Sequence, residues 1–130
     1  MSNRRRPARD NGYRAGFLRS PAWFARRDRW FHARAATGVP VLCALCDAVG
    51  DHRTLELHHL DYAGVVRGAR GWRSLERDED LLPLHPACHE LLHRLIDRDT
   101  VLSRQRTRRD ATTIALALLK NAITQENSHA

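Results

Sequence analysis

Two pairs of histidines, one on each side of a glycine-containing segment, constrain this chain more than any other feature. His58 and His59 end a short run in which apolar and polar residues alternate, which predicts a half-buried strand. His89 and His93 lie four positions apart in a helical run, so both imidazoles project from one helical face. Neutral imidazole is the commonest nitrogen ligand of divalent transition metals. We therefore expect a strand and a helix that meet around a metal ion.

The residues around the histidines predict the connections between these elements. Residues 81–84 are mostly apolar and favour a second short strand that turns directly into the helix. Pro86 suits the first helical position, where its missing N–H would have had no partner. Residues 61–79 contain three glycines, so we expect a long loop there without regular structure.

Three cysteines and one further histidine form two pairs at the spacing of a zinc knuckle. Two residues separate Cys43 from Cys46, and two residues also separate His85 from Cys88. Each pair can bind one side of a tetrahedral zinc ion, and such an ion would stabilise a chain whose core is small. His89 adjoins Cys88 and is the alternative fourth ligand. We favour His85, because its spacing repeats that of the cysteine pair.

Cysteine usage and hydropathy indicate the compartment. Cysteines at ligand spacing favour zinc thiolates over secreted disulfides. The chain has no apolar run of membrane-spanning length, and no hydrophobic segment follows its Arg-rich start, so we expect neither a membrane span nor a signal peptide. We therefore expect a cytoplasmic protein with one small domain.

The positive charge is concentrated near the N-terminus. The net charge is +7 at pH 7, and residues 1–34 contain ten arginines against two acidic residues. Such a block suits a polyanion such as nucleic acid, although a solvated tail explains it equally well. The arginines that we expect to bind nucleic acid are Arg4, Arg5, Arg6, Arg26, Arg27, Arg29 and Arg34.

Helix signals appear on both sides of the histidine segment. Ser20 as N-cap, followed by a proline, predicts a helix over about residues 21–36, with its aromatic side chains in the core. Asp110 as cap predicts a last helix over about residues 111–125. The expected organisation is a flexible basic arm (1–19), a central domain (20–97), a linker with the last helix (98–125) and a tail (126–130).

Taken in order, these residues resemble the HNH endonucleases, also called ββα-metal or His-Me finger nucleases, in the branch with a zinc knuckle. That family's pattern is Cys-x-x-Cys, a strand ending in Asp-His or His-His, a loop, a strand opened by Asn or Asp, and Cys-x-x-Cys-His-x-x-x-His. The resemblance covers about residues 43–96, with His85 where a Cys is usual and Asp80 where Asn is usual. It implies an α+β fold, in which a small ββα-metal core with a zinc knuckle is flanked by an N-terminal basic helix and a C-terminal helix.

The resemblance also implies a role for each matching residue. The expected catalytic residues are His59, as general base, and Asp80, as the carboxylate that orients it. The expected ligands of one catalytic divalent ion (Mg²⁺, Mn²⁺, Ni²⁺ or Zn²⁺) are His58, His89 and His93. The expected ligands of a structural Zn²⁺ are Cys43, Cys46, His85 and Cys88.

The implied activity is metal-dependent hydrolysis of nucleic-acid phosphodiester bonds, with double-stranded DNA as the expected partner. The metal would stabilise the leaving group while His59 takes a proton from the attacking water. One alternative is a zinc-knuckle nucleic-acid-binding module without catalysis, for which the histidine pairs would have no use. Another is a nuclease toxin that cleaves RNA, which would keep every motif. The sequence predicts no membrane partner and identifies no protein partner.

Overall fold

The computed structural model of the chain describes residues 11–128, with side chains from residue 15 to residue 127. The fold is α+β and contains three separate pairs of antiparallel strands. The helices are α1 (Asn11–Leu18), α2 (Pro21–Thr37), α3 (Pro86–Arg98), α4 (Thr100–Arg104) and α5 (Arg108–Ser128), with a short 3-10 helix η2 (Asp78–Asp80). The strands are β1 (Val41–Leu42), β2 (Val49–Gly50), β3 (Glu56–His59), β4 (Val65–Gly68), β5 (Gly71–Ser74) and β6 (Leu81–Leu84).

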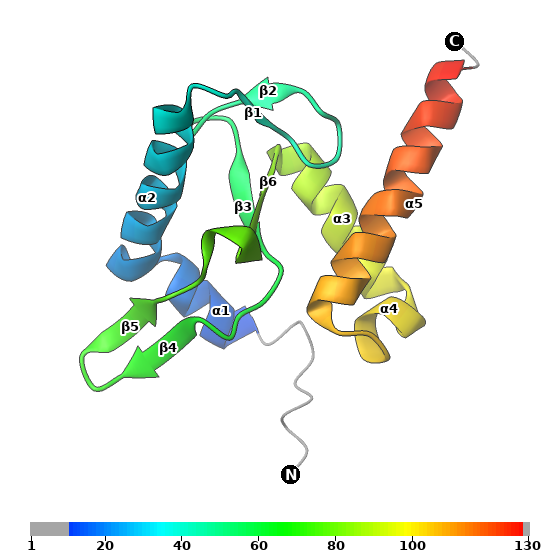
Figure 1. Ribbon diagram of the computed structural model, residues 1–130. Coiled ribbons are helices and arrows are strands. Elements are labelled where there is room, and N and C mark those ends of the chain that lie inside the picture. The colour runs from blue at the N-terminus through cyan, green and yellow to red at the C-terminus, as the bar shows by residue number, and fades with distance from the viewer. Residues whose placement is uncertain (1–10, 129–130) are drawn as a thin grey trace.

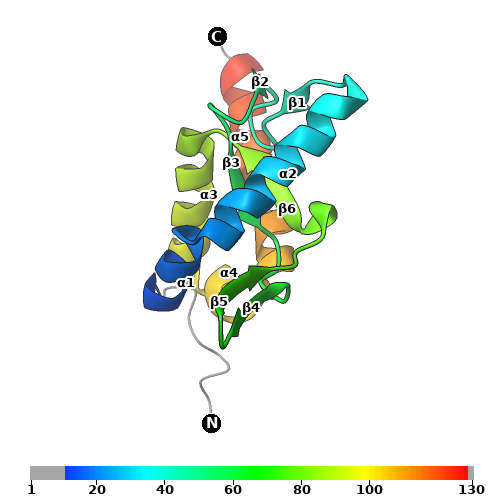
Figure 2. The same ribbon diagram turned by 90° about the vertical axis from the view of Figure 1, so that its left-hand side faces the viewer.

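The β3–β6 pair is the centre of the molecule (Figure 1). The two strands are antiparallel, with His58 opposite Leu82 and His59 opposite Leu81. Strand β6 continues through His85 into α3, which begins at Pro86. Both expected strands and the expected helix start are therefore confirmed. Helix α2 lies on one side of the strand pair, and α3 and α5 lie on the other (Figures 1 and 2).

The segment between the two central strands is not the irregular loop that we expected. Strands β4 and β5 form a hairpin there, in which Gly68 pairs with Gly71. Gly71 has a φ of 103°, a value that glycine adopts without strain. At Gly64 a Cβ atom would lie 2.6 Å from the backbone nitrogen of Glu76, so a larger residue would push this part of the chain away. The glycines thus shape a hairpin and a close backbone contact.

Helix α2 follows the sequence prediction closely. The side chain of Ser20 accepts a hydrogen bond from the Trp23 N–H, and the helix ends at Gly38, which has a φ of 73°. Trp23 and two further aromatic residues of α2 are buried, as expected for core contacts. Phe24 is the exception, since about half of its surface is exposed.

Helix α1 was not expected, because the sequence favours a flexible arm over residues 1–19. The side chain of Phe17 is fully buried and packs against the rings of Trp23 and Trp72. The helix is therefore part of the folded core over residues 15–18, whose side chains are described. Residues 1–10 of the expected arm, with Arg4, Arg5 and Arg6, lie outside the described residues.

The last helix is longer than predicted and has a different cap. Helix α5 spans Arg108–Ser128, so it includes part of the expected tail. Its cap is Thr107, whose hydroxyl accepts a hydrogen bond from the Asp110 N–H; Asp110 itself lies in the first turn. Ala111 and Ala115 are buried, and α5 packs against α3. Within the described part of the chain, no helix has the length and apolar character needed to cross a membrane.

Candidate functional site

Three of the expected metal ligands lie together between β3 and α3. The Nδ1 atom of His58 is 3.2 Å from the Nε2 atom of His89, and the Nε2 atom of His93 is 3.0 Å from the same atom. Nitrogen ligands about 2.1 Å from one ion, at angles of about 90–109°, would be about 3.0–3.4 Å apart. The three imidazoles are therefore a group that could hold a metal ion.

The surroundings of His58 favour its neutral, metal-binding form. Burial lowers the pKa of His58 well below its usual value, and the positive charge of Arg108 lowers it further. The Nδ1 atom of His89 lies 2.8 Å from the carboxylate of Glu56. A carboxylate accepts the N–H of that nitrogen, which leaves the other nitrogen as a lone-pair donor toward the group. Neutral imidazole is the form in which histidine binds a metal ion.

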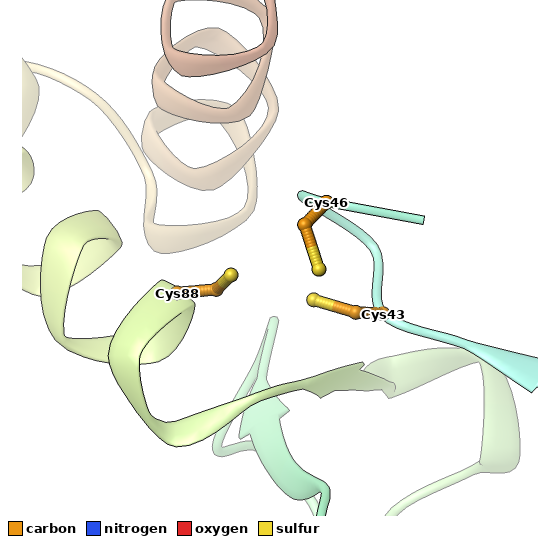
Figure 3. Close-up of side chains that lie close together, drawn as sticks. All are labelled: Cys43, Cys46 and Cys88. Carbon is orange, nitrogen blue, oxygen red and sulfur yellow. The ribbon is translucent and has the colours of Figure 1, made fainter. Parts of the chain in front are cut away.

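A second group of ligands lies where the β1–β2 turn meets the start of α3. The side chains of Cys43, Cys46 and Cys88 point toward one another (Figure 3) and could hold a metal ion. The Nδ1 atom of His85 is 3.5 Å from the Cys46 sulfur. On a tetrahedral zinc ion, a sulfur and a nitrogen ligand would be about 3.6 Å apart. His85 thus lies beside one sulfur of the cysteine group without being part of that group, and the alternative fourth ligand, His89, lies in the histidine group.

The pKa values of two of the cysteines, Cys43 and Cys88, are shifted in opposite directions. Burial raises the pKa of the Cys43 thiol, but backbone hydrogen bonds from Cys46, His85 and Leu45 outweigh that effect and lower the pKa to about 6. Burial and the two neighbouring sulfurs raise the pKa of Cys88 to about 12. One thiolate therefore forms readily, and its negative charge opposes the next. A bound divalent cation would remove that repulsion.

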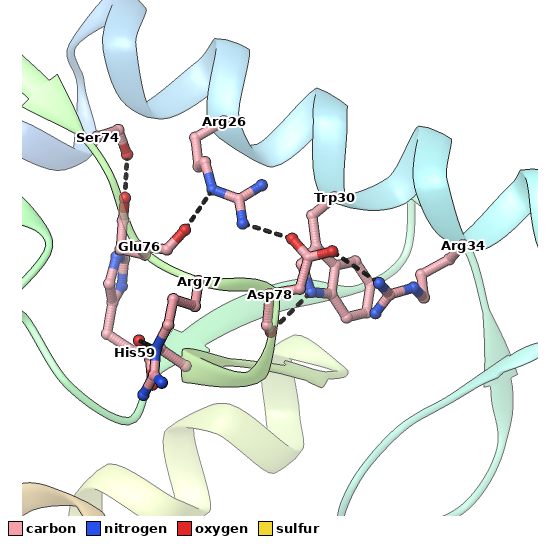
Figure 4. Close-up of polar contacts among 9 residues, drawn as sticks. Arg26, Trp30, Arg34, His59, Ser74, Glu76, Arg77 and Asp78 are labelled. Carbon is pink, nitrogen blue, oxygen red and sulfur yellow. Dashed lines mark hydrogen bonds and ion pairs between the residues drawn. The ribbon is translucent and has the colours of Figure 1, made fainter.

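The imidazole of His59 is buried among polar and aromatic side chains. Its Nε2 atom is 2.6 Å from the carboxylate of Glu76, which also accepts a hydrogen bond from the Ser74 hydroxyl (Figure 4). The ring stacks on Tyr62, with centroids 4.3 Å apart, and lies 4.6 Å from the ring of Trp23. Only 1% of His59 is exposed.

Glu76 is a site residue that the sequence analysis missed. Burial raises the pKa of its carboxyl, but hydrogen bonds from His59 and Ser74 outweigh burial, so the net pKa lies below the usual value. The carboxylate is therefore ionised at neutral pH beside an imidazole. Ser74 and Glu76 are two residues apart, an alternation that points both side chains to one side of an extended segment. That alternation is the only sequence signal that could have pointed to Glu76 as a site residue.

Asp80 does not occupy the position that we expected for it. Its carboxylate pairs with Arg77 and Arg109, while the carboxylate bound to His59 belongs to Glu76. The hydrogen bond from Arg77 is the largest influence on Asp80 and lowers the pKa of its carboxyl. Its backbone oxygen accepts a hydrogen bond from the Leu60 N–H at 2.8 Å. Asp80 therefore contacts the end of β3 through its backbone.

Most of the described arginines that we expected to bind nucleic acid bind the protein itself. Arg26 is buried and donates to the Glu76 backbone oxygen and to the Asp78 carboxylate, which Arg34 also binds (Figure 4). Arg27 donates to two backbone oxygens, those of His52 and Leu55. Of the four expected on α2, Arg29 is the one that is exposed, while the others are buried or half-buried.

Two arginines at the start of α5 lie beside the histidines and were not anticipated. The Nε atom of Arg108 donates to the backbone oxygen of His59 at 2.6 Å, and its guanidinium lies over the ring of Tyr62. Arg109 pairs with Asp80. The start of α5 therefore contributes positive charge close to the end of β3, in a part of the chain that we had placed outside the central domain.

Comparison of the chain with protein-family models, with curated proteins and with solved structures found no match in any of the three. Over the residues that it describes, the structure defines an α+β protein with two groups of side chains that could hold metal ions, one of three histidines and one of three cysteines. Any narrower assignment depends on the arrangement of these residues.

Proposed function

We propose that this chain is a metal-dependent nuclease of the HNH type, with a ββα-metal core, that hydrolyses phosphodiester bonds in nucleic acid, most readily double-stranded DNA. One observation carries the proposal. Two consecutive residues of β3 have different chemical partners, because His58 faces the ligand nitrogen of His89, whereas His59 faces the carboxylate of Glu76. A residue of a group that could hold a metal ion is thus directly followed in the chain by a histidine–carboxylate pair, and hydrolysis by a metal and a general base uses both features.

Each side chain then has a defined task. His58, His89 and His93 would hold the ion, which when bound supplies Lewis-acid stabilisation of the phosphate and the leaving oxygen. His59 takes the proton from the attacking water. Glu76 holds the His59 ring through Nε2, which gives Nδ1 the role of proton acceptor, and its charge stabilises the imidazolium that forms.

The ligand set bears on which ion is used. Three imidazoles suit zinc, nickel and similar transition ions, while magnesium prefers carboxylate, carbonyl and water oxygens. The described ligand group is made of nitrogen donors. We therefore expect transition ions to support the reaction better than Mg²⁺. At the cysteine site, sulfur and nitrogen donors favour a structural zinc.

One observation favours a second candidate, a zinc-stabilised nucleic-acid-binding domain without catalysis. His59 is almost completely buried, and a general base must reach the water that it activates. In the nuclease, substrate binding has to open the surroundings of this ring. In the binding domain, the His59–Glu76 pair would only stabilise the fold.

Cleavage assays separate these candidates. The purified full chain is incubated with supercoiled plasmid and with a structured RNA, each in Mg²⁺, Mn²⁺, Ni²⁺ or Zn²⁺. We expect plasmid cleavage that is strongest with a transition ion and that is lost in His93→Ala. The matched control is His32→Ala, which replaces an exposed histidine of α2 and should cleave like the parent. Binding of DNA without cleavage in any metal would favour the second candidate, and cleavage of RNA alone would identify an RNA nuclease.

His59→Ala tests the general base within the same assay. The variant keeps all three histidine ligands, so it should bind the metal ion and lose on the order of 10²–10⁴-fold in cleavage rate. Metal binding is followed by calorimetry and cleavage under single-turnover conditions. Equal cleavage rates for the variant and the parent would contradict the role of His59.

A further inference from the structure

We propose that Thr112 of α5 orients the ring of His58 and accepts its Nε2–H, which supports the tautomer that can bind a metal through Nδ1 and makes α5 part of the metal centre. The inference rests on the proposed function for the metal centre of His58, His89 and His93. The sequence analysis gave Thr112 no role and placed the helix outside the central domain.

Each ring nitrogen of His58 lies within hydrogen-bond distance of one other side chain. Nε2 is 2.9 Å from the hydroxyl oxygen of Thr112, and Nδ1 is 3.2 Å from Nε2 of His89. Both residues are buried, with 1% of His58 and none of Thr112 exposed. A buried polar group requires a partner, so this hydrogen bond is a condition for burying either side chain.

The hydroxyl of Thr112 can donate or accept a hydrogen bond, and metal binding through Nδ1 of His58 requires it to accept. A neutral imidazole has one N–H and one lone pair, and a metal ion binds only the lone pair. A hydroxyl can accept a hydrogen bond, so Thr112 can accept the Nε2–H and leave the lone pair on Nδ1, toward the histidine group. With the proton on Nδ1 instead, the ring could not bind an ion there. Glu56 has the same relation to His89, with a carboxylate as the acceptor.

The position of α5 is set by more than this one contact. Arg108 and Thr112 are four residues apart and therefore lie on one face of the helix. Arg108 donates to the backbone oxygen of His59, and Thr112 meets the ring of His58, so the face contacts two consecutive residues of β3. Ala111 and Ala115 are buried beside them, and their small side chains allow the helix to approach closely. The helix thus contacts the end of β3 through the backbone oxygen of His59 and through the side chain of His58.

Two substitutions separate hydrogen bonding from packing. Thr112→Val keeps the shape of the side chain and removes the hydroxyl, whereas Thr112→Ser keeps the hydroxyl and removes a methyl group. If Thr112 only packs, valine should be tolerated at least as well as serine. If it fixes the tautomer, serine should preserve metal binding, and valine should not.

The first measurement is the affinity of the full chain, loaded with one equivalent of zinc, for Ni²⁺ by calorimetry. We expect about 10–100-fold weaker binding in Thr112→Val and a change of at most a few-fold in Thr112→Ser. Parent-like Ni²⁺ affinity in Thr112→Val would overturn the inference. His93→Ala reports on the centre itself, because unchanged Ni²⁺ binding in that variant would contradict the proposed metal centre rather than the role of Thr112.

The second measurement does not depend on Ni²⁺ binding. Two-bond proton–nitrogen NMR correlations of the histidine rings identify the tautomer of His58 in the chain loaded with Zn²⁺. We expect Nε2 to carry the proton in the parent and in Thr112→Ser, with this preference lost in Thr112→Val. A parent ring protonated on Nδ1 would overturn the inference, even if the valine variant fails to fold.

Discussion

The imidazole of His59 and the carboxylate of Glu76 form a buried pair in which Nε2 and Oε2 are 2.6 Å apart. Both side chains are removed from water, with 1% of one and none of the other exposed. Hydrogen bonds between such groups are strengthened by the low local dielectric, and losing one partner leaves the other unsatisfied. In the proposed nuclease, the pair fixes the orientation of the general base, so its carboxylate is the most informative target for mutation.

Replacing Glu76 with glutamine should slow cleavage without removing the metal. Glutamine keeps the size of the side chain but loses the charge that stabilises a protonated His59. We expect a 10–100-fold lower cleavage rate, with metal affinity unchanged. Single-turnover cleavage and calorimetry measure the two effects. Glu79→Gln, three residues away and well exposed, is the matched control. A Glu76→Gln enzyme as fast as the parent would show that the pair has no part in catalysis.

Removing the structural metal should unfold the chain. The cysteine group lies between the β1–β2 turn and the start of α3, so the free energy of binding a metal ion there would stabilise the contact between them. We expect a chelator to lower the melting temperature and the helical circular dichroism signal of the parent, and added Zn²⁺ to restore both. Cys88→Ser should have the lower melting temperature and the weaker helical signal without a chelator. Added Zn²⁺ should restore neither. A parent melting curve that a chelator leaves unchanged would mean that the group does not stabilise the fold.

The ion pair between Arg26 and Asp78 should make stability depend on acid pH. The hydrogen bond from Arg26 lowers the pKa of the Asp78 carboxyl below its usual 3.8. Stability from this pair is therefore fully present above about pH 4 and is lost as the pH falls through the lowered value. Asp78→Asn should reduce the free energy of unfolding at pH 7 by about 1 kcal/mol, a figure discounted because the carboxylate is partly exposed.

Urea denaturation at pH 7 and at pH 3 checks this prediction. The difference between Asp78→Asn and the parent should narrow at pH 3, because the Asp78 carboxyl of the unfolded parent is then largely protonated, which favours the unfolded state. Asp28→Asn, at an exposed position of α2, the helix that carries Arg26, is the control. It should differ little from the parent at either pH. A difference that stays constant between the two pH values would exclude the ion pair as its cause.

Deleting residues 1–10 should weaken DNA binding without affecting the fold. The deletion removes four arginines and one aspartate, and it stops before Phe17, whose burial makes a longer deletion unsuitable. Each lost phosphate contact should reduce the slope of log affinity against log salt by about 0.9, so we expect a change of about 2–3. Binding titrations between low and moderate salt measure the slope. An unchanged slope would identify this segment as a solvated tail.

The central strands and helices were predictable because their signals are local. Ser20 and Pro86 mark helix starts through their own backbone chemistry, and the alternation that ends at His59 defines a strand. The β4–β5 hairpin was missed because its glycines were interpreted as signs of irregular structure, although Gly71 only closes a turn. Helix α1 was missed because Phe17 becomes a core residue only through contacts with distant rings.

The candidate ligands were predictable because residue type and spacing are visible in the sequence. Their supporting partners were not, since Glu76 reaches His59 and Thr112 reaches His58 only in the folded chain. Charge was misleading for a related reason. An arginine such as Arg26 looks the same in a sequence whether it faces a phosphate or, as here, a carboxylate of its own protein.

The contact between His58 and Thr112 joins residues that are 54 positions apart. During synthesis the ribosome therefore releases His58 well before the helix that holds its ring. All three histidine ligands precede α5 as well, so a nascent chain would carry them without that helix in place. The order in which the protein is made thus delays the contact between Thr112 and the ring of His58 until α5 has been translated, and the proposed hydrolase would mature only after that point.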